Sequence, residues 1–185
     1  MQASCNREED PYNPTLPEAT KIGANTFGCK INGQIMVPKD SRVSSQLGGA
    51  PTGVNYSTAR GLNIRYDWIE AIDRVENRGG IAFKLPNIDS LGVGEYIIKH
   101  VDGAFSQANT NIVYMGAIYN GGSPTSGYSS IENTGKIIIT RYDDEVISGT
   151  FYCTLKNDIH PNDIIQITEG RFDFNKNTIN TTSFR

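Results

Sequence analysis

Two histidines are the side chains best suited to chemistry, and neither belongs to a recognisable site. His100 ends the strand-like segment YIIKH, and His160 precedes a proline in NDIHPND. A zinc site needs three or four Cys, His or carboxylate ligands, and neither histidine has them at a metal-binding spacing. The serines lack a G-x-S-x-G motif, which would mark a nucleophile elbow. We therefore assign no catalytic, metal-binding or cofactor-binding residue from local motifs.

Acidic residues offer a second kind of chemistry. The run Asp143-Asp144-Glu145 resembles the start of a calcium loop, but Val146-Ile147 breaks the alternation of oxygen ligands that an EF-hand needs. A hairpin turn explains the run better, because Asp side chains accept hydrogen bonds from nearby backbone N–H groups. The carboxylate pairs of glycosidases come from separate strands and leave no local signature. A small glycan-active hydrolase therefore remains the alternative to a non-catalytic protein.

The composition narrows the classes of partner. Seventeen Lys and Arg residues against twenty Asp and Glu residues give a formal net charge of −3, without a basic run. A nucleic-acid partner is disfavoured, because phosphate binding needs concentrated positive charge. No apolar stretch approaches the ~18 residues of a membrane-spanning helix. The 19 glycines, with many Asn, Thr and Ser residues, favour turns and strands over helices.

The first residues resemble the N-terminus of a bacterial lipoprotein. Ala3-Ser4-Cys5 is similar to the end of a lipobox, whose cysteine is lipidated when the signal peptide is removed, although Gln2 stands where that motif usually has Leu. The charged residues 7–10 resemble the export signal of Bacteroides-type lipoproteins. The resemblance implies acyl chains such as palmitate on Cys5 and an outer-membrane location, surface-exposed or periplasmic. The alternative is a frayed terminus with an unrelated cysteine.

Residues 11–21, PYNPTLPEATK, separate this N-terminus from the rest of the chain. Three prolines within them exclude a helix and disfavour the ladder hydrogen bonds of a strand. We expect an extended tether, so that residues 1–21 form the lipoprotein N-terminus and residues 22–185 form a single β domain. A chain of this length buries ~70% of its unfolded surface, which is enough for a core without metal or disulfide support.

Two-residue alternation of apolar side chains dominates the domain and predicts an all-β fold. About nine short strands with mostly short turns are typical of an antiparallel β-sandwich or a flattened barrel, and the pattern does not separate the two. Asn32-Gly33 is a two-residue hairpin signal, and Gly170 marks a bulge between two strand segments. Residues 41–59 are rich in Gly, Ser and Thr, which predicts a long loop.

One segment is ambiguous between helix and strand. Within residues 67–76, Trp68, Ile72 and Val75 have helical spacing, although strand alternation fits nearly as well. We expect one short helical turn here.

The two ends of the domain carry a second resemblance. The segments GKIIITRYDDEVISGTFYCTL and IIQITEGRFDF are similar to the closing part of an uncharacterised family of Bacteroides-type lipoproteins. The shared pattern is Ile-Thr-x-x-Asp, then Ile-Ser-Gly-Thr-Phe, then Ile-Thr-Glu-Gly-Arg-Phe-Asp. The early segment ANTFGCKINGQIMVP resembles the first strand pair of that family. The likeness spans both ends of residues 24–174 and implies the fold of the family, which has no assigned activity.

Two further features concern covalent chemistry. Cys29 and Cys153 both point toward the predicted core, and in an oxidising compartment they would form a disulfide if their Cα atoms came within ~7 Å. Such a bridge would stabilise the fold by up to ~5 kcal/mol, whereas the alternative is two separate buried thiols. Asp89-Ser90-Leu91 resembles the O-glycosylation motif of exported Bacteroides-type proteins, which makes Ser90 a candidate modification site.

Taken together, these patterns predict a lipid-anchored envelope protein with a non-catalytic binding or structural role. Its partners would be the outer membrane, through the anchor, and a glycan, a peptide or a neighbouring envelope protein. Trp68, Tyr119 and Tyr128 are candidates for ligand stacking, because sugar faces stack on exposed aromatic rings. A small apolar ligand inside a barrel is a third possibility, which predicts an empty lumen.

Overall fold

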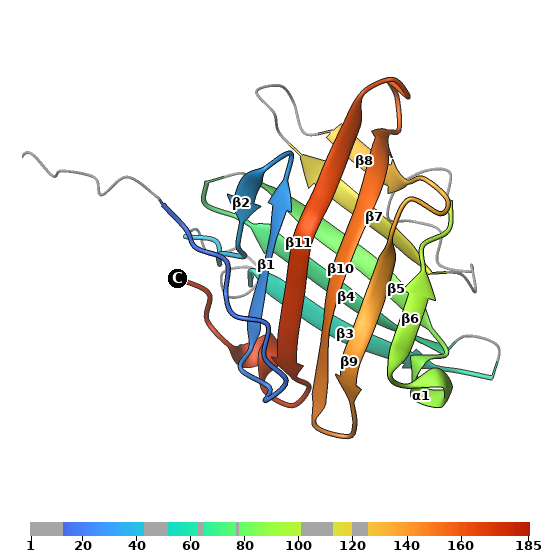
Figure 1. Ribbon diagram of the computed structural model, residues 1–185. Helices are drawn as coiled ribbons and strands as arrows, with labels where there is room; N and C mark the ends of the chain where they lie inside the picture. Colours follow the sequence, from blue (N-terminus) through green and yellow to red (C-terminus); the bar gives the residue numbers. More distant parts are fainter. Residues whose placement is uncertain (1–12, 43–51, 63–64, 77, 101–112, 120–125) are drawn as a thin grey trace, which may run out of the picture.

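The chain folds into one curled antiparallel β-sheet whose two halves face each other (Figure 1). The computed structural model describes residues 13–42, 52–62, 65–76, 78–100, 113–119 and 126–185. Eleven strands, one short α-helix and one 3-10 turn lie within these residues. The predicted all-β class is confirmed, as a half-open barrel. Among the helices of the described ranges, none is long and apolar enough to cross a membrane.

Most strands are short, and the two longest are neighbours near the end of the chain. The elements are β1 (Thr26–Ile31), β2 (Gln34–Met36), β3 (Val54–Arg60), β4 (Arg65–Asp73), β5 (Gly79–Pro86), α1 (Ile88–Leu91), β6 (Gly94–Ile97), β7 (Tyr114–Tyr119), β8 (Ser126–Ser130), β9 (Lys136–Tyr142), β10 (Val146–Asn157), β11 (Ile164–Asn175) and η1 (Ile179–Thr181). The order across the sheet is β2-β1-β11-β10-β8-β7-β5-β4-β3, and β9 and β6 extend it beside β10.

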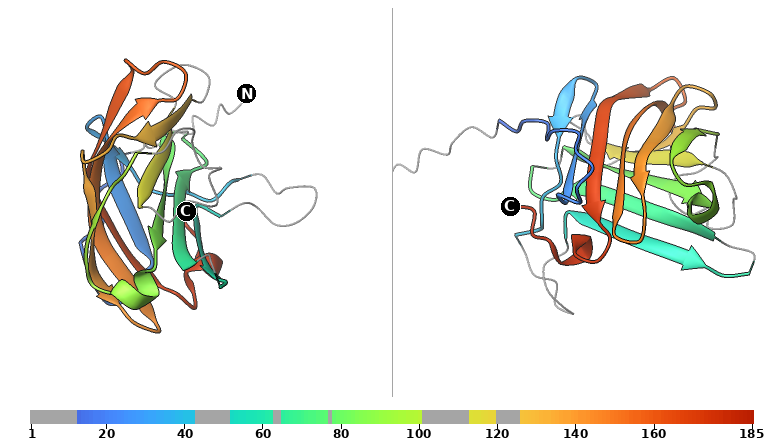
Figure 2. Two further views of the ribbon diagram at one scale, coloured as in Figure 1. Left: turned by 90° about the vertical axis from the view of Figure 1, so that its right-hand side faces the viewer. Right: turned by 60° about the horizontal axis from the view of Figure 1, so that its bottom comes forward.

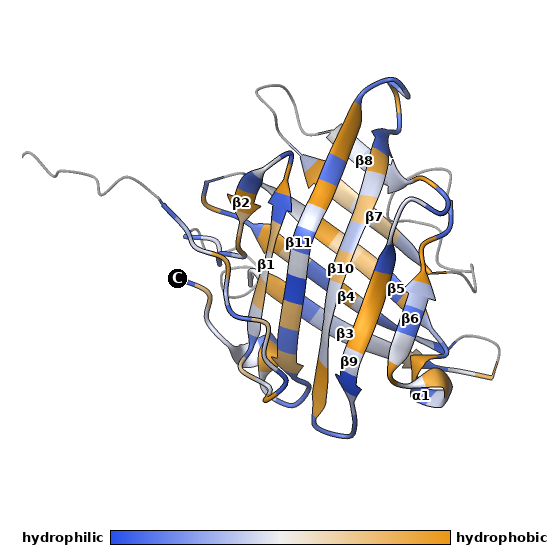
Figure 3. Cartoon of the chain, in the orientation of Figure 1, coloured by the Kyte–Doolittle hydropathy of each residue, from blue (hydrophilic) through white to orange (hydrophobic). Residues whose placement is uncertain are grey.

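Two leaves of the sheet pack face to face, one built around β1, β11 and β10 and the other around β4, β5 and β7 (Figure 2). Hydrophobic and hydrophilic residues alternate along β11, as a strand with one buried face requires (Figure 3). The Phe83 ring of one leaf lies 5.3 Å from Phe151 and 5.5 Å from Phe172 of the other leaf. The space between the leaves is therefore a packed aromatic core, and not the empty lumen that a ligand inside a barrel would need.

The first hairpin and the β11 bulge lie where the sequence predicts them. The turn at residues 32–33 has φ angles of 48° and 82°, as a two-residue hairpin turn requires. In β11, Gly170 pairs with Phe151 while Ile167 pairs with Cys153, so β11 contains one extra residue. A Cβ at Gly170 would lie 2.4 Å from the Phe151 ring. Only glycine fits at this position.

Residues 67–76 form no helix, so the predicted helical turn is wrong. Most of the segment belongs to β4, which pairs with β3 on one edge and with β5 on the other. Ile69 and Ala71 are fully buried, whereas Trp68 and Ile72 lie half-buried on the opposite face. Ladder hydrogen bonds on both edges hold the backbone extended, and this outweighs a weak helical spacing over so short a segment. The short helix of this fold, α1, follows β5 instead.

The loop predicted over residues 41–59 is only partly correct. β3 occupies its end, and residues 43–51 lie outside the described part of the chain. β3 is an edge strand that buries Val54 and Tyr56, while the residues between and after them are polar or small. Because so few of its side chains are apolar, the strand has a weak alternation signal.

The last part of the predicted tether packs on the sheet instead of extending away from it. Asp173 of β11 is 1% exposed, and its carboxylate accepts a hydrogen bond from Thr20 Oγ1 at 2.6 Å. The backbone N–H groups of residues 22–24 donate to the same carboxylate at 2.8–3.2 Å. Pro17 covers Gly28 of β1, where a Cβ would lie 2.7 Å from the proline ring. The packed domain therefore begins earlier in the chain than predicted.

Candidate functional site

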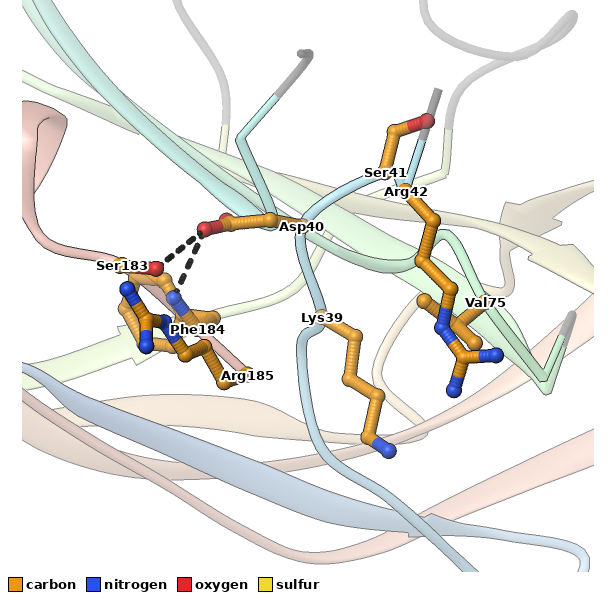
Figure 4. Close-up of a pocket in the computed structure, with 8 residues that line it drawn as sticks. All are labelled: Lys39, Asp40, Ser41, Arg42, Val75, Ser183, Phe184 and Arg185. Carbon is orange, nitrogen blue, oxygen red and sulfur yellow. Dashed lines mark hydrogen bonds between the residues drawn. The ribbon is translucent and has the colours of Figure 1, made fainter. Parts of the chain in front are cut away.

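A pocket of about 460 Å³ opens where three separate segments meet (Figure 4). Its walls are residues 39–42 after β2, Val75 after β4, and residues 183–185. The volume lies within the ~300–1,000 Å³ that is typical of small-molecule sites. We call this feature the C-terminal pocket.

Asp40 joins the segments that form the C-terminal pocket. Its Oδ1 accepts a hydrogen bond from Gly53 N at 2.7 Å, and its Oδ2 accepts from Ser183 Oγ at 3.0 Å and from Phe184 N at 2.9 Å. The Asp40 backbone N–H also donates to the Phe184 carbonyl oxygen at 2.7 Å. This carboxylate is therefore a structural bridge between the 183–185 wall and the segment that leads into β3.

Backbone pairing positions the opposite wall. Lys39 forms an isolated parallel bridge with Asp73 at the end of β4. The Lys39 N–H donates to the Ile72 carbonyl oxygen at 3.1 Å, and the Arg74 N–H donates to the Lys39 carbonyl oxygen at 3.2 Å. These bonds hold the chain after β2 beside β4, and so bring residues 39–42 to Val75.

The lining of the C-terminal pocket is cationic with an apolar patch. Lys39, Arg42 and Arg185 contribute positive charge, and Val75 and Phe184 contribute apolar surface. The hydroxyls of two serines complete the lining, and its single carboxylate side chain is engaged in the bridge described above. Such a surface can attract an anion by charge and hold the body of a ligand by contact.

A second group of polar side chains lies near α1, and we call it the Asp67 cluster (Tyr56, Arg60, Asp67 and Tyr142). Asp67 on β4 is fully buried, and its Oδ2 accepts hydrogen bonds from Tyr56 Oη at 2.6 Å and from Tyr142 Oη at 3.2 Å. Arg60 forms an ion pair with Asp67 Oδ1. The cluster links β3 and β4 of one leaf to β9 of the other.

The electrostatics of the Asp67 cluster are those of a closed network. Burial, followed by the charge of Asp67, raises the pKa of Tyr56 and the pKa of Tyr142 far above the ordinary range. Burial lowers the pKa of the Arg60 guanidinium, but the hydrogen bond and charge of Asp67 outweigh it, so the net pKa is raised. Both phenols keep their protons at neutral pH, and both oxygens of Asp67 are engaged. The arrangement stabilises the fold and is closed to a substrate.

The three residues predicted to stack on a ligand do not form a shared face. Trp68 lies half-buried on the outer face of β4, with its ring 6.1 Å from that of Tyr114. Tyr128 is 5% exposed and donates to Asp163 Oδ2 at 2.7 Å. Tyr119 packs edge-on against Tyr128, with 6.4 Å between the ring centroids. Because Tyr128 is buried against the core, its ring is closed to a ligand.

Cys29 and Cys153 are separate buried thiols and not a disulfide. Cys29 lies on β1 and Cys153 lies on β10, and β11 runs between these two strands. Two interstrand spacings place the strands ~10 Å apart, which exceeds the ~7 Å reach of a disulfide. Burial raises the pKa of the Cys29 thiol far above its ordinary value and raises the pKa of Cys153 to about 11. Neither thiol is therefore a reactive thiolate.

The two predicted modification sites differ in what the structure says about them. Ser90 is exposed in α1, and its neighbour Leu91 is 65% exposed, so an enzyme could reach the Ser90 hydroxyl. Its O-glycosylation stays a prediction. Cys5 lies outside the described residues, and its lipidation stays a prediction as well.

The histidines and the acidic run lie at strand ends and turns. His100 Nδ1 lies 3.0 Å from a backbone carbonyl oxygen, and His160 lies in an exposed turn. Asp143 Oδ1 accepts hydrogen bonds from the backbone N–H groups of Glu145 and Val146, which confirms the predicted turn. Across the described ranges, no group of three or more His, Cys, Asp or Glu residues is placed to hold a metal ion.

Sequence reasoning missed the residues that line the C-terminal pocket and the residues of the Asp67 cluster. Arg42 and Arg185 lie in irregular segments without periodicity, so no sequence signal identifies them. Asp67 had a detectable signal, because it occupies a core position in the alternation of β4. A buried carboxylate implies a cationic or hydrogen-bonding partner.

In comparisons with known proteins, no family model, no curated protein and no solved structure matches the chain.

Proposed function

We propose that this chain is an exported, lipid-anchored envelope protein whose β domain binds a ligand without catalysis at the C-terminal pocket. The observation that carries the proposal is a pocket of about 460 Å³ with cationic and apolar lining, in which the single carboxylate side chain serves the fold. The envelope location is supported by the lipobox-like Ala3-Ser4-Cys5 and by the resemblance to Bacteroides-type lipoproteins. An outer-membrane anchor and a glycan, peptide or envelope partner follow from this proposal.

The alternative, a small glycan hydrolase, needs two carboxyl groups ~5–9 Å apart in one cleft. Among the residues that line the C-terminal pocket, Asp40 is the one carboxylate side chain, and both of its oxygens accept hydrogen bonds from the chain itself. Asp67 is fully buried behind Tyr56 and Tyr142. A catalytic carboxyl group must reach its substrate, so neither residue supports hydrolysis.

The proposed anchor would hold the domain close to the membrane. Eight residues of chain lead from Cys5 to Asn13, where the described structure begins. An extended chain spans at most ~3.3–3.6 Å per residue, so this stretch reaches no more than ~29 Å. The first described residues and the C-terminus lie on the same side of the molecule in Figure 1. A ligand of the C-terminal pocket would therefore be met on the membrane side of the domain.

A ligand screen on the full-length chain with Cys5→Ser tests the binding function. The substitution removes the attachment point of the lipid and keeps the segment that contacts Asp173. We expect a glycan array or a pull-down of purified envelope components to yield a partner that Val75→Glu no longer binds, because the new carboxylate fills the pocket. The control is Leu62→Glu, at a fully exposed turn position. A partner that both variants bind equally would place the binding site elsewhere, and no partner in either screen would favour a structural role.

The same preparation distinguishes binding from hydrolysis. Each glycan that binds is incubated with the protein, and released sugar is measured over hours. We expect no turnover. Turnover that disappears in Asp40→Asn while binding persists would support the hydrolase instead.

Lipidation has its own test in the cell. The full-length precursor should fractionate with membranes, and its processing should be sensitive to globomycin, which inhibits the lipoprotein signal peptidase. Cys5→Ala should release the protein from the membrane fraction. Unchanged membrane association of the Cys5→Ala protein would contradict the anchor.

A further inference from the structure

We infer that the ligand of the C-terminal pocket carries an oxyanion, a carboxylate or a phosphate, which Arg42 and Arg185 bind. This inference rests on the proposed binding function and adds the chemical class of the ligand. It depends on which arginines of the fold already have partners.

Most described arginines are engaged within the protein. Five of them donate a hydrogen bond to a carboxylate or a carbonyl oxygen, and a sixth, Arg78, also has an interaction partner. The five are Arg60, Arg65, Arg74, Arg141 and Arg171. By contrast, the guanidinium groups of Arg42 and Arg185 have no hydrogen bond or ion pair to any residue in the described part of the chain. Both of these side chains line the same pocket.

The two arginines lie at opposite ends of the C-terminal pocket (Figure 4). Arg42 comes from the segment after β2 and lies beside Val75, whereas Arg185 lies beside Phe184 on the other side of Lys39 (Figure 4). A guanidinium binds carboxylate or phosphate oxygens through two parallel N–H donors, which gives both strength and orientation. Lys39 also lines the pocket, but the inference does not depend on it.

The charge of the pocket is unlike that of the protein as a whole. The chain has a formal net charge of −3, so its overall field does not attract anions. Two arginines without a partner among the described residues nevertheless line one pocket of about 460 Å³, and its one carboxylate side chain, Asp40, is engaged by the chain itself. Because the pocket also has apolar walls from Val75 and Phe184, the geometry suits an anionic group attached to a less polar body, such as an acidic sugar or a sugar phosphate.

Matched pairs of small ligands test this inference. The full-length chain with Cys5→Ser is titrated with methyl glucuronoside against methyl glucoside, and with glucose 6-phosphate against glucose, by calorimetry or by NMR shifts. Each pair differs chiefly in the anionic group. We expect at least one anionic member to bind at least tenfold more tightly than its neutral counterpart, and added salt to weaken that binding. Inorganic phosphate, as a third probe, reports whether the anion alone suffices.

Variants locate the effect in the pocket. Arg42→Gln and Arg185→Gln should each weaken binding of the anionic probe by about tenfold or more, since each removes one charge-assisted contact. Lys156→Gln on β10 makes the same change in net charge outside the pocket, and should leave the affinity unchanged. An equal effect of all three variants would reduce the result to general electrostatics and overturn the inference.

The outcomes separate this inference from the function on which it rests. Equal binding of the anionic and neutral members would overturn the inference that the ligand carries an oxyanion, but not the proposed binding function. Tighter binding of a neutral glycan that Val75→Glu abolishes would have the same meaning. If none of the anionic probes binds, the inference of an oxyanion ligand is also overturned. Only the additional failure of the broader screen would remove the binding function as well.

Discussion

The Asp67 cluster and the C-terminal pocket both gather charged side chains, but two cations of the pocket, Arg42 and Arg185, have no partner among the described residues. Asp67 is fully buried, and two phenols and a guanidinium engage its oxygens. In the pocket, Arg42 and Arg185 lie exposed at the surface and lack such partners within the described chain. In the Asp67 cluster the charged groups pair with one another and join the two leaves. In the proposed binding site, Arg42 and Arg185 could instead pair with a ligand.

The difference shows that the number of charges in a cluster does not identify a binding site. A buried ion pair with all its hydrogen bonds satisfied has little left to offer a ligand, and removing one member leaves the other charge uncompensated. An unpaired cation beside open space has the opposite properties. Substitutions should therefore change stability at the Asp67 cluster and change binding at the C-terminal pocket.

The largest effect is expected at Asp67. Asp67→Ala leaves Arg60, Tyr56 and Tyr142 without their common acceptor, and we expect the free energy of unfolding to fall by about 3–5 kcal/mol. Urea denaturation followed by fluorescence measures this change. The matched control Asp144→Ala, in an exposed hairpin turn, should stay within about 0.5 kcal/mol of the parent. Similar losses of unfolding free energy in Asp67→Ala and Asp144→Ala would contradict the claim that the buried, paired carboxylate matters more for stability than an exposed one.

A pH titration extends the test to a third carboxylate, Asp173. Burial raises its pKa, but hydrogen bonds from Thr20 and from the backbone N–H groups of residues 22–24 outweigh burial, so the net pKa lies below its usual value. A lowered pKa means that the stabilisation is present above the unfolded pKa of about 3.9 and is lost as the pH falls through the folded value. We expect acidification below about pH 4 to lower stability.

The release of residues 22–24 reports on Asp173 directly. Hydrogen exchange of their amides should accelerate as Asp173 becomes protonated. Asp173→Asn should show fast exchange already at neutral pH and should lose about 1.5–3 kcal/mol, the range for hydrogen bonds to a charged group. Slow exchange in this variant would mean that packing, as at Pro17, holds the segment without the carboxylate.

An intermediate effect is expected at Asp40, which belongs to the pocket but has partners. Asp40→Ala removes the acceptor for Gly53, Ser183 and Phe184, and should lower stability by about 1–3 kcal/mol. It should also abolish ligand binding, because the 183–185 wall loses its attachment. Denaturation and titration of the same preparation measure both effects. Binding that survives intact would show that the wall is held by other contacts.

The smallest effect on stability is expected at the arginines of the pocket. Arg42→Gln and Arg185→Gln should change the free energy of unfolding by no more than about 0.5 kcal/mol, because both side chains are exposed and have no partner among the described residues. Arg60→Gln, the same substitution in the Asp67 cluster, should cost about 3 kcal/mol or more. Comparable losses at Arg42 and Arg60 would contradict the contrast between the two regions.

Much of the fold could be predicted from the sequence, and the two misses have different causes. The hairpin at residues 32–33 and the bulge at Gly170 follow from local geometry, and the all-β class follows from period-two alternation. The helical turn predicted over residues 67–76 failed because pairing with two neighbouring strands decided its conformation. β3 was overlooked because an edge strand buries few side chains.

The C-terminal pocket could not be predicted from the sequence, because its walls come from separate parts of the chain. Residues 39–42, Val75 and residues 183–185 come together through the Asp40 bridge and a backbone pair at Lys39, none of which leaves a local pattern. The stacking residues, by contrast, were selected by type alone, and Tyr128 proved to be part of the core.

The sequence by itself determined that this chain forms an antiparallel all-β domain, because alternation and turn residues act over a few neighbouring positions. Only the tertiary structure decided which charged side chains have partners within the protein. The partners of Asp67, Asp173 and Asp40 lie on segments far away along the chain. Electrostatic interactions depend on distance in space, and distance in space is what folding sets.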